Sequence, residues 1–322
     1  MKKVLLLIPG DSSFLLPIVR YFEQKKWQVS HYDYRKGSNF VRIFRFTPVI
    51  GGFEKAMQKI FEDILKTANN FKPDLILVIK GENLTPQFLK KLKVQNPKST
   101  LVNWFPDPLN QWELMKTISP YYDYYFDSDP SVCRKLKKIG RKNVHYLTFA
   151  SEFESNTNKK KKYDVAFVGT YSPFREKYLS SLKKFYLNIW GDPRWFKSSL
   201  RQFTRGGRIH QSKMKDIVKR SRININIHHN TPREGTNLRV FEITGSGGFL
   251  LSDYVKDLER IFKIGKEIET FKNSNELVKK VRFYLGNPFS AAKIAQKGYA
   301  RAKRNHSYKE RLAQMLKITR LS

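Results

Sequence analysis

Short apolar runs alternate with segments of helical periodicity along almost the whole chain of 322 residues. Such alternation is typical of β-α-β units, in which helices cover both faces of a parallel sheet. A first series of expected strands covers residues 4–8, 27–34, 75–79, 100–105, 124–127 and 144–147. A second series covers residues 164–168, 186–190, 223–227, 249–251 and 267–270. The sequence therefore predicts an α/β fold with two doubly wound domains in tandem.

A polar segment separates the two series. Residues 154–162 are mostly polar or charged and end in a run of four lysines, which is typical of an interdomain linker. The predicted domains are thus 1–153 and 163–305. A last helix is expected within 306–322, because Ser307 and Glu310 have the spacing of a capping box, and we expect this segment to pack back on the first domain.

The charge of the chain points to a polyanionic partner. Lys and Arg number 62 against 28 Asp and Glu, which leaves a net charge of +34. A magnitude of roughly 2–8 is usual for a small soluble domain. Nucleic acid, an anionic membrane surface and phosphorylated small molecules all fit this excess. The single cysteine, Cys133, excludes an internal disulfide framework and a cysteine-built zinc site, as in cytoplasmic proteins. No apolar stretch approaches the length of a membrane span, roughly 18 residues or more.

Doubly wound folds bind ligands at the carboxyl ends of their strands. After the first expected strand, Gly10 lies in a turn before a helix that Asp11 or Ser12 would cap, and free backbone N–H groups there suit an anion. An ordinary tight turn fits this sequence equally well. The loop does not have the G-x-G-x-x-G pattern, which disfavours a dinucleotide cofactor.

A second candidate anion site follows residues 164–168. Ser172 is placed to cap a helix whose first turn contains Pro173, and Arg175 would add a planar, charged donor to that N-terminus. Phosphate fits there, and so does the alternative of a surface arginine on an ordinary turn.

The most informative segment is residues 230–254. A helix is expected over 237–244, and two glutamates separated by seven residues, Glu234 in the preceding loop and Glu242 on the helix, flank its start. Carboxylates bind sugar hydroxyls while a helix N-terminus holds phosphate. A solvated pair is the alternative, although apolar and glycine-rich packing sequence follows Glu242. His228 and His229 follow a strand and point to opposite faces, so we expect no metal there.

This segment resembles the E-(seven residues)-E signature of retaining GT-B glycosyltransferases, and the chain resembles the CgeB-like group of glycosyltransferases. The likeness extends in the same order over residues 72–81, 104–108, 122–123, 164–175, 223–242, 265–267 and 297–308. It implies a GT-B fold, in which two Rossmann-like domains face a cleft, with the acceptor bound by residues 1–153 and a nucleotide sugar by residues 163–305.

The resemblance also implies roles for individual residues. Glu242 would hold the ribose hydroxyls, Glu234 the transferred sugar, and Arg175 the diphosphate. Arg239 would supply a second cation, because Thr170 stands where many GT-B enzymes have arginine. The implied donor-binding residues are Glu242, Arg175, Arg239, Gly235, Thr236, Asn237, Gly169, Thr170, Gly247, Ile209 and Gly10, and the implied catalytic residues are Glu234 and Asp107. Asp107 would be the base of an inverting enzyme, or else a turn cap before Pro108.

We therefore expect a metal-independent, retaining transferase that moves a hexose-type sugar from a UDP, GDP or dTDP sugar, without a bound cofactor, to an acceptor hydroxyl. A surface glycan, a lipid-linked glycan and a protein are the expected acceptors. The charge favours a cytoplasmic protein in peripheral contact with the anionic inner face of a membrane. The alternatives are a glycosyltransferase that modifies a hydroxylated DNA base and a noncatalytic protein that binds nucleotide or nucleic acid.

Overall fold

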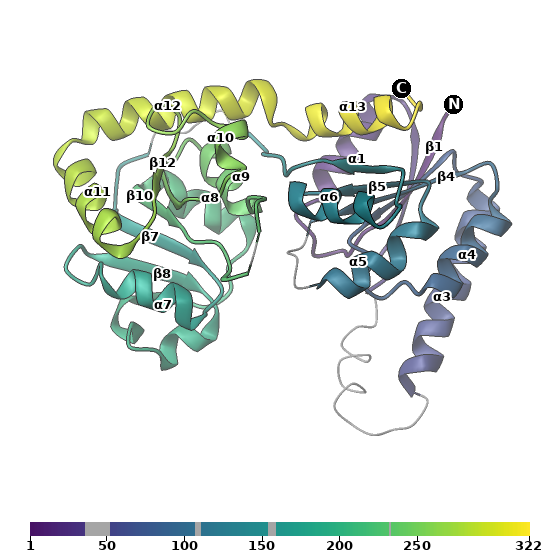
Figure 1. Cartoon of the computed structure of the whole chain (residues 1–322), viewed down its shortest axis with the longest axis horizontal. Coiled ribbons are helices and arrows are strands. Elements are labelled where there is room, and N and C mark those ends of the chain that lie inside the picture. Colours follow the sequence, from purple (N-terminus) through teal and green to yellow (C-terminus); the bar gives the residue numbers. More distant parts are fainter. Residues whose placement is uncertain (36–51, 107–110, 154–158, 232) are drawn as a thin grey trace. The chain divides into compact units, whose positions relative to one another are not determined.

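The computed structural model describes residues 1–35, 52–106, 111–153, 159–231 and 233–322. These residues form two compact units, one from Met1–Thr148 with Leu312–Ser322 and the other from Phe149–Arg311. Each unit contains one six-stranded sheet with helices packed against it (Figure 1). The expected α/β class with two doubly wound sheets is confirmed. No helix in the described ranges is long and apolar enough to cross a membrane.

The first sheet is entirely parallel and has the strand order β2-β1-β3-β4-β5-β6. Its strands are β1 (Lys3–Leu7), β2 (Gln28–Tyr32), β3 (Leu75–Ile79), β4 (Thr100–Phe105), β5 (Tyr124–Asp127) and β6 (Val144–Tyr146). The helices are α1 (Leu15–Gln24), α3 (Gly52–Phe71), α4 (Pro86–Gln95), α5 (Trp112–Ile118), η2 (Ser119–Tyr121) and α6 (Pro130–Lys138). Buried apolar side chains of α3, α4, α5 and α6 form one cluster with alternate residues of the strands, such as Leu5, Leu7, Ile76 and Val78.

The first helix begins later than the sequence predicts. We expected Asp11 or Ser12 to cap it, but α1 starts at Leu15, and its N-cap Phe14 provides no side-chain cap. The ring of Phe14 instead packs edge-on against Trp104, with the ring centroids 5.2 Å apart. The Ser12 hydroxyl accepts from the Phe14 N–H at 3.3 Å, in the turn that precedes α1 and not from within the helix.

The second sheet is also parallel and has the order β12-β11-β10-β7-β8-β9. Its strands are β7 (Tyr163–Gly169), β8 (Leu187–Gly191), β9 (Thr204–Gly206), β10 (Ser221–Asn226), β11 (Leu250–Asp253) and β12 (Glu269–Phe271). The helices are α7 (Pro173–Ser180), η3 (Pro193–Lys197), η4 (Arg201–Phe203), α8 (Gln211–Arg220), α9 (Leu238–Gly245), α10 (Leu258–Ile261), α11 (Ser274–Gly286) and α12 (Pro288–Asn305). The last helix, α13 (Tyr308–Ile318), lies mostly in the first unit, which includes Leu312–Ser322. Strand β9 is not among the expected strands, because none of its three residues is buried.

Local capping signals place several helix starts correctly. The Ser172 hydroxyl accepts a hydrogen bond from the Arg175 backbone N–H at 3.2 Å and so caps α7. The Asn237 side chain caps α9 in the same way, and the Ser307 hydroxyl accepts from the Glu310 N–H at 3.1 Å at the start of α13. These starts follow from sequence because the cap and its partner lie within three residues of each other.

Candidate active site

The strand order of the second sheet reverses between β7 and β10. Numbered from β7, the order is that of the Rossmann fold, in which ligands bind outside the carboxyl ends of the strands where the order reverses. The loops that follow β7 and β10 therefore mark the candidate site. Most of the residues proposed from sequence for the donor lie in these two loops and at the start of α7 and α9.

Arg175 joins the two loops. Its Nε and Nη2 donate to the Ile227 carbonyl after β10 at 3.0 and 2.7 Å. Its Nη1 donates to the carbonyl and the hydroxyl of Thr170 after β7 at 3.0 and 2.6 Å. The residue is 6% exposed. The structure thus uses four donor contacts of this guanidinium to tie the ends of β7 and β10, and a contact with diphosphate stays a prediction.

Burial lowers the pKa of Arg175 to about 10, and Arg239 adds to the lowering while Asp253 opposes it. The guanidinium is therefore still charged at neutral pH, and this positive charge lies where the strand order reverses between β7 and β10. Gly169 leaves room for the Phe167 ring beside this guanidinium, because a Cβ there would lie 2.8 Å from Cζ of Phe167.

A buried hydrogen-bond chain connects β11, β10 and the loop before α9. His228 Nδ1 lies 2.6 Å from Asp253 Oδ1, and His228 Nε2 lies 3.1 Å from the Thr236 hydroxyl. Because a carboxylate only accepts, the Nδ1–H donates to Asp253, and the ring in its neutral form accepts from Thr236 at Nε2. His228 is 2% exposed and Thr236 is fully buried. This hydrogen-bond chain fixes Thr236 at the site and engages its hydroxyl, so that the backbone N–H of Thr236 is the donor left for a nucleotide.

The loop before α9 presents backbone donors. Arg233 donates hydrogen bonds to the carbonyls of Gly235 and Thr236, so these two carbonyls are satisfied within the loop. The backbone N–H groups of Gly235, Thr236 and Asn237 find no acceptor among the described residues. These three donors lie beside the N-terminus of an eight-residue helix, where the helix dipole is positive. The arrangement can bind an anion such as a diphosphate.

Asn237, Glu242 and Glu234 differ in the hydrogen bonds and ion pairs that their side chains make within the protein and in their exposure. The Asn237 side chain caps α9 and donates to the Asn226 Oδ1 at 3.0 Å. Glu242 pairs with Arg239 at 2.5 Å, and the two side chains are 14% and 25% exposed. Glu234 is half-buried in the loop, and its carbonyl accepts from the Asp257 N–H at 3.1 Å. Glu242 and Arg239 therefore form a partly exposed ion pair on one face of α9.

Four residues proposed from sequence do not join this group. Gly247 lies at the opposite end of α9, where its φ of +74° ends the helix. Ile209 lies between β9 and α8, and it is half-buried. Gly10 belongs to the other unit, where a Cβ would lie 2.8 Å from Asp33 Oδ2. Asp107 lies outside the described residues.

Sequence reasoning missed two residues that build the site. Asp253 and Arg233 lie within residues 230–254, but the sequence pattern indicated no role for either, and it indicated for His228 only that a metal site is not expected. Asp253 could have been predicted, because it is a carboxylate at the end of an apolar strand and ligands bind at the carboxyl ends of strands in this class of fold. Among the described residues, no group of His, Cys, Asp and Glu has the arrangement of a metal site.

Comparison with known proteins shows one family match and a shared fold. Residues 174–317 match the family model described as glycosyl transferase-like. HepE of Anabaena, solved in complex with UDP and glucose, superimposes with a TM-score of 0.70 at 12% identity, covering 99% of this chain and 100% of that one. Sucrose-phosphate synthase of Thermosynechococcus elongatus gives 0.69 at 11% identity, covering 99% and 98%. The lipopolysaccharide outer core galactosyltransferase WaaB gives 0.63 at 10% identity, covering 99% of both chains.

Residues 174–317 are thus similar to a glycosyl transferase-like family, and the chain shares the GT-B fold of these solved structures. None of the curated proteins is detectably similar to it in sequence. The finer grouping with CgeB-like enzymes stays a prediction.

Proposed function

We propose that this chain is a glycosyltransferase that holds a nucleoside diphosphate sugar in the unit Phe149–Arg311 and transfers the sugar, with retention, to a hydroxyl of a glycan. The observation that carries the proposal is the set of three backbone N–H donors at the N-terminus of α9, with Glu242 on the same helix. The diphosphate would accept from the N–H groups, and Glu242 would accept from the ribose hydroxyls. The HepE complexes with UDP support a uridine nucleotide as the donor.

The same geometry suits the chemical step. Negative charge grows on the leaving diphosphate as the glycosidic bond breaks, and donors that are already oriented stabilise that charge without rearrangement. Arg175 supports this orientation, because it holds the ends of β7 and β10 together. Arg239 adds a cation on the exposed side of α9. Glu234 would contact the hydroxyls of the transferred sugar, and Asp107 stays the predicted base for an inverting reaction only.

The test uses the ribose as a probe. Calorimetry compares the binding of UDP and 2′-deoxy-UDP to the parent chain and to Glu242→Gln. We expect the parent chain to prefer UDP, and the variant to bind UDP about 10- to 150-fold more weakly, because a charge-assisted hydrogen bond is worth roughly 1.5–3 kcal/mol. We also expect the variant to lose most of the preference for UDP over 2′-deoxy-UDP.

The matched control is Glu310→Gln, which neutralises an exposed glutamate on α13. It should bind both nucleotides as the parent chain does. If Glu242→Gln keeps the full preference for UDP, Glu242 does not hold the ribose. If the parent chain binds neither UDP, GDP nor dTDP, the proposed donor site is wrong.

Retention is tested by the configuration of the product. The resemblance to retaining enzymes and the spacing of Glu234 and Glu242 support it. Proton NMR during hydrolysis of UDP-glucose, a donor with an α linkage, should show α-glucose as the first anomer formed, before mutarotation. β-Glucose as the first product would establish inversion and would make Asp107 the predicted base.

Turnover of UDP-glucose, even if slow, also distinguishes a transferase from a noncatalytic binding protein of the same fold.

A further inference from the structure

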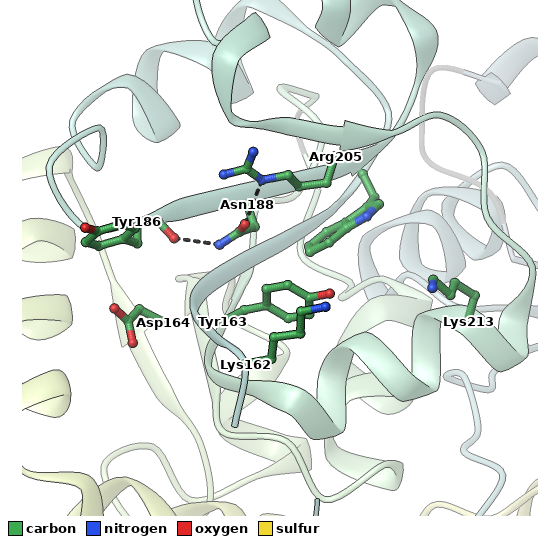
Figure 2. A pocket seen from close by; sticks show the side chains of 8 residues that line it. Lys162, Tyr163, Asp164, Tyr186, Asn188, Arg205 and Lys213 are labelled. Atoms are coloured by element: carbon green, nitrogen blue, oxygen red, sulfur yellow. Dashed lines mark hydrogen bonds between the residues drawn. The ribbon is translucent and has the colours of Figure 1, made fainter. Parts of the chain in front are cut away.

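The unit Phe149–Arg311 contains a cavity, with a volume of about 590 Å³, on the surface formed by β7, β8, β9 and α8 (Figure 2). Three aromatic side chains line it, Tyr163, Tyr186 and Trp190, together with three cationic side chains, Lys162, Arg205 and Lys213. Figure 2 shows Tyr186 at one end and Lys213 at the other. None of these residues belongs to the loops of the candidate donor site.

The three cations are not neutralised by the protein. No carboxylate among the described residues lies within ion-pair distance of Lys162, Arg205 or Lys213. Asp164 also lines the cavity, but its Oδ1 lies 3.6 Å from the Nε of Arg222. Three uncompensated positive charges around one concave surface attract an anionic ligand.

A buried asparagine orients two of the lining residues. Asn188 is 7% exposed, its Oδ1 accepts from Arg205 Nε at 2.9 Å, and its Nδ2 donates to the Tyr186 carbonyl at 2.7 Å (Figure 2). Neither Nη group of Arg205 hydrogen-bonds to a described residue. The guanidinium is therefore held by one nitrogen and keeps its other donors for a ligand.

The backbone at Tyr186 is strained. This residue has a φ of +47° and is 79% exposed. An L-residue with a bulky side chain in the left-handed region costs about 1–2 kcal/mol, and such conformations gather at functional sites. Exposure of the ring recovers none of this energy through burial. The strain and the exposure are two observations, independent of the charges, that point to a ligand at this end of the cavity.

We propose that this cavity binds an acidic saccharide, with its carboxylate or phosphate groups on Arg205, Lys162 and Lys213 and a sugar face against the exposed ring of Tyr186. Aromatic side chains offer apolar faces to the C–H groups of a sugar ring, and the guanidinium fork fits a carboxylate or a phosphate. The choice of a saccharide rests on the proposed glycosyl transfer, whereas the choice of an anion rests on the cavity itself. The site would hold part of an acidic glycan acceptor away from the donor.

The experiment measures binding by calorimetry to the full chain, without nucleotide, at 50 mM salt. The probes are tetragalacturonic acid, neutral maltotetraose and the oligonucleotide (dT)4. We expect tetragalacturonic acid to bind at least tenfold more tightly than maltotetraose, and to lose affinity at 200 mM salt because screening weakens the ion pairs. Equal affinity for the acidic and the neutral saccharide would overturn the proposal. Binding of (dT)4 without binding of either saccharide would overturn it too and would assign the cavity to nucleic acid.

Variants separate a binding role from a structural one. Tyr186→Gly should weaken tetragalacturonic acid at least fivefold while the chain becomes no less stable to urea, because glycine adopts a positive φ without strain. Lys213→Gln should weaken it severalfold, whereas the matched exposed lysine variant Lys256→Gln should not. Parent-like affinity in both Tyr186→Gly and Lys213→Gln would refute the site. The same two variants should bind UDP as the parent chain does, because the cavity is separate from the donor site. If the parent chain itself does not bind UDP, the proposed donor site is wrong, and the saccharide measurements still test this cavity.

Discussion

His306 gives the second unit a specific sensitivity to acid. Its Nε2 lies 3.1 Å from the Ile261 carbonyl, and its Nδ1 lies 2.6 Å from an Nη of Arg311. The carbonyl and the guanidinium can both be satisfied only by the neutral ring, which donates at Nε2 and accepts at Nδ1. A second proton would have to lie on Nδ1 and face the Arg311 cation. Burial and the Arg311 charge, in that order, lower the pKa of His306 from 6.5 to about 4.

The sign of the effect follows from this lowered pKa. Below pH 6.5 the unfolded chain takes up a proton at His306 that the folded unit does not accept, so the free energy of unfolding falls as the pH falls towards 4. The stabilisation is complete above pH 6.5. The pKa difference corresponds to about 3 kcal/mol once the pH is below 4, and to about 2 kcal/mol at pH 5. The latter value is large against a typical stability of roughly 5–15 kcal/mol.

The assay compares unfolding in urea at pH 7.5 and pH 5.0, read by deuterium pulse-labelling of peptides from β10 and α12. Subtracting the change in unfolding free energy of His306→Gln from that of the parent chain removes the contribution of every other titrating group. We expect the parent chain to lose about 2 kcal/mol more than His306→Gln over this interval, because glutamine keeps a donor and an acceptor but does not titrate. The control His229→Gln removes an exposed histidine and should follow the parent chain.

The reasoning is refuted if His306→Gln and the parent chain show the same pH dependence. It is also refuted if the parent chain gains stability on acidification relative to the variant, because that result would require a raised pKa.

Three further predictions concern stability, each measured by urea unfolding. Arg175→Met should lower the free energy of unfolding by about 2–5 kcal/mol, because the Ile227 and Thr170 carbonyls lose a charged donor; an effect no larger than that of the exposed Arg201→Met would contradict its bridging role. Thr236→Val should lower it by about 1–3 kcal/mol and Thr236→Ser by less, since serine keeps the hydroxyl for His228; equal effects would show that this hydrogen bond contributes nothing. Gly298→Ala should destabilise, because its Cβ would lie 2.2 Å from the Glu267 carbonyl oxygen, whereas Gly286→Ala, with open space around it, should be neutral or stabilising by roughly 0.5–1 kcal/mol; the opposite ranking would refute the close approach of Gly298 on α12 to Glu267.

Much of the architecture was predictable because it depends on short-range patterns. The apolar runs gave every strand except β9, within a few residues of the observed bounds. Strand β9 escaped because it is a three-residue edge strand with no buried side chain, which leaves no hydrophobic pattern to detect. The late start of α1 was not predicted, and the residue at its N-cap, Phe14, packs against Trp104, 90 residues away, which no local pattern indicates.

For the candidate site, the sequence determined which residues are present and which of them start helices. Ser172 and Asn237 cap α7 and α9 because each cap bonds within its own turn. The tertiary structure decided what the polar side chains contact. Arg175 reaches across 52 residues to Ile227, and Asp253 reaches 25 residues to His228. These partners meet only because β7, β10 and β11 lie side by side with their carboxyl ends at one edge of the sheet, and that order is set by packing of the whole unit and not by any local pattern.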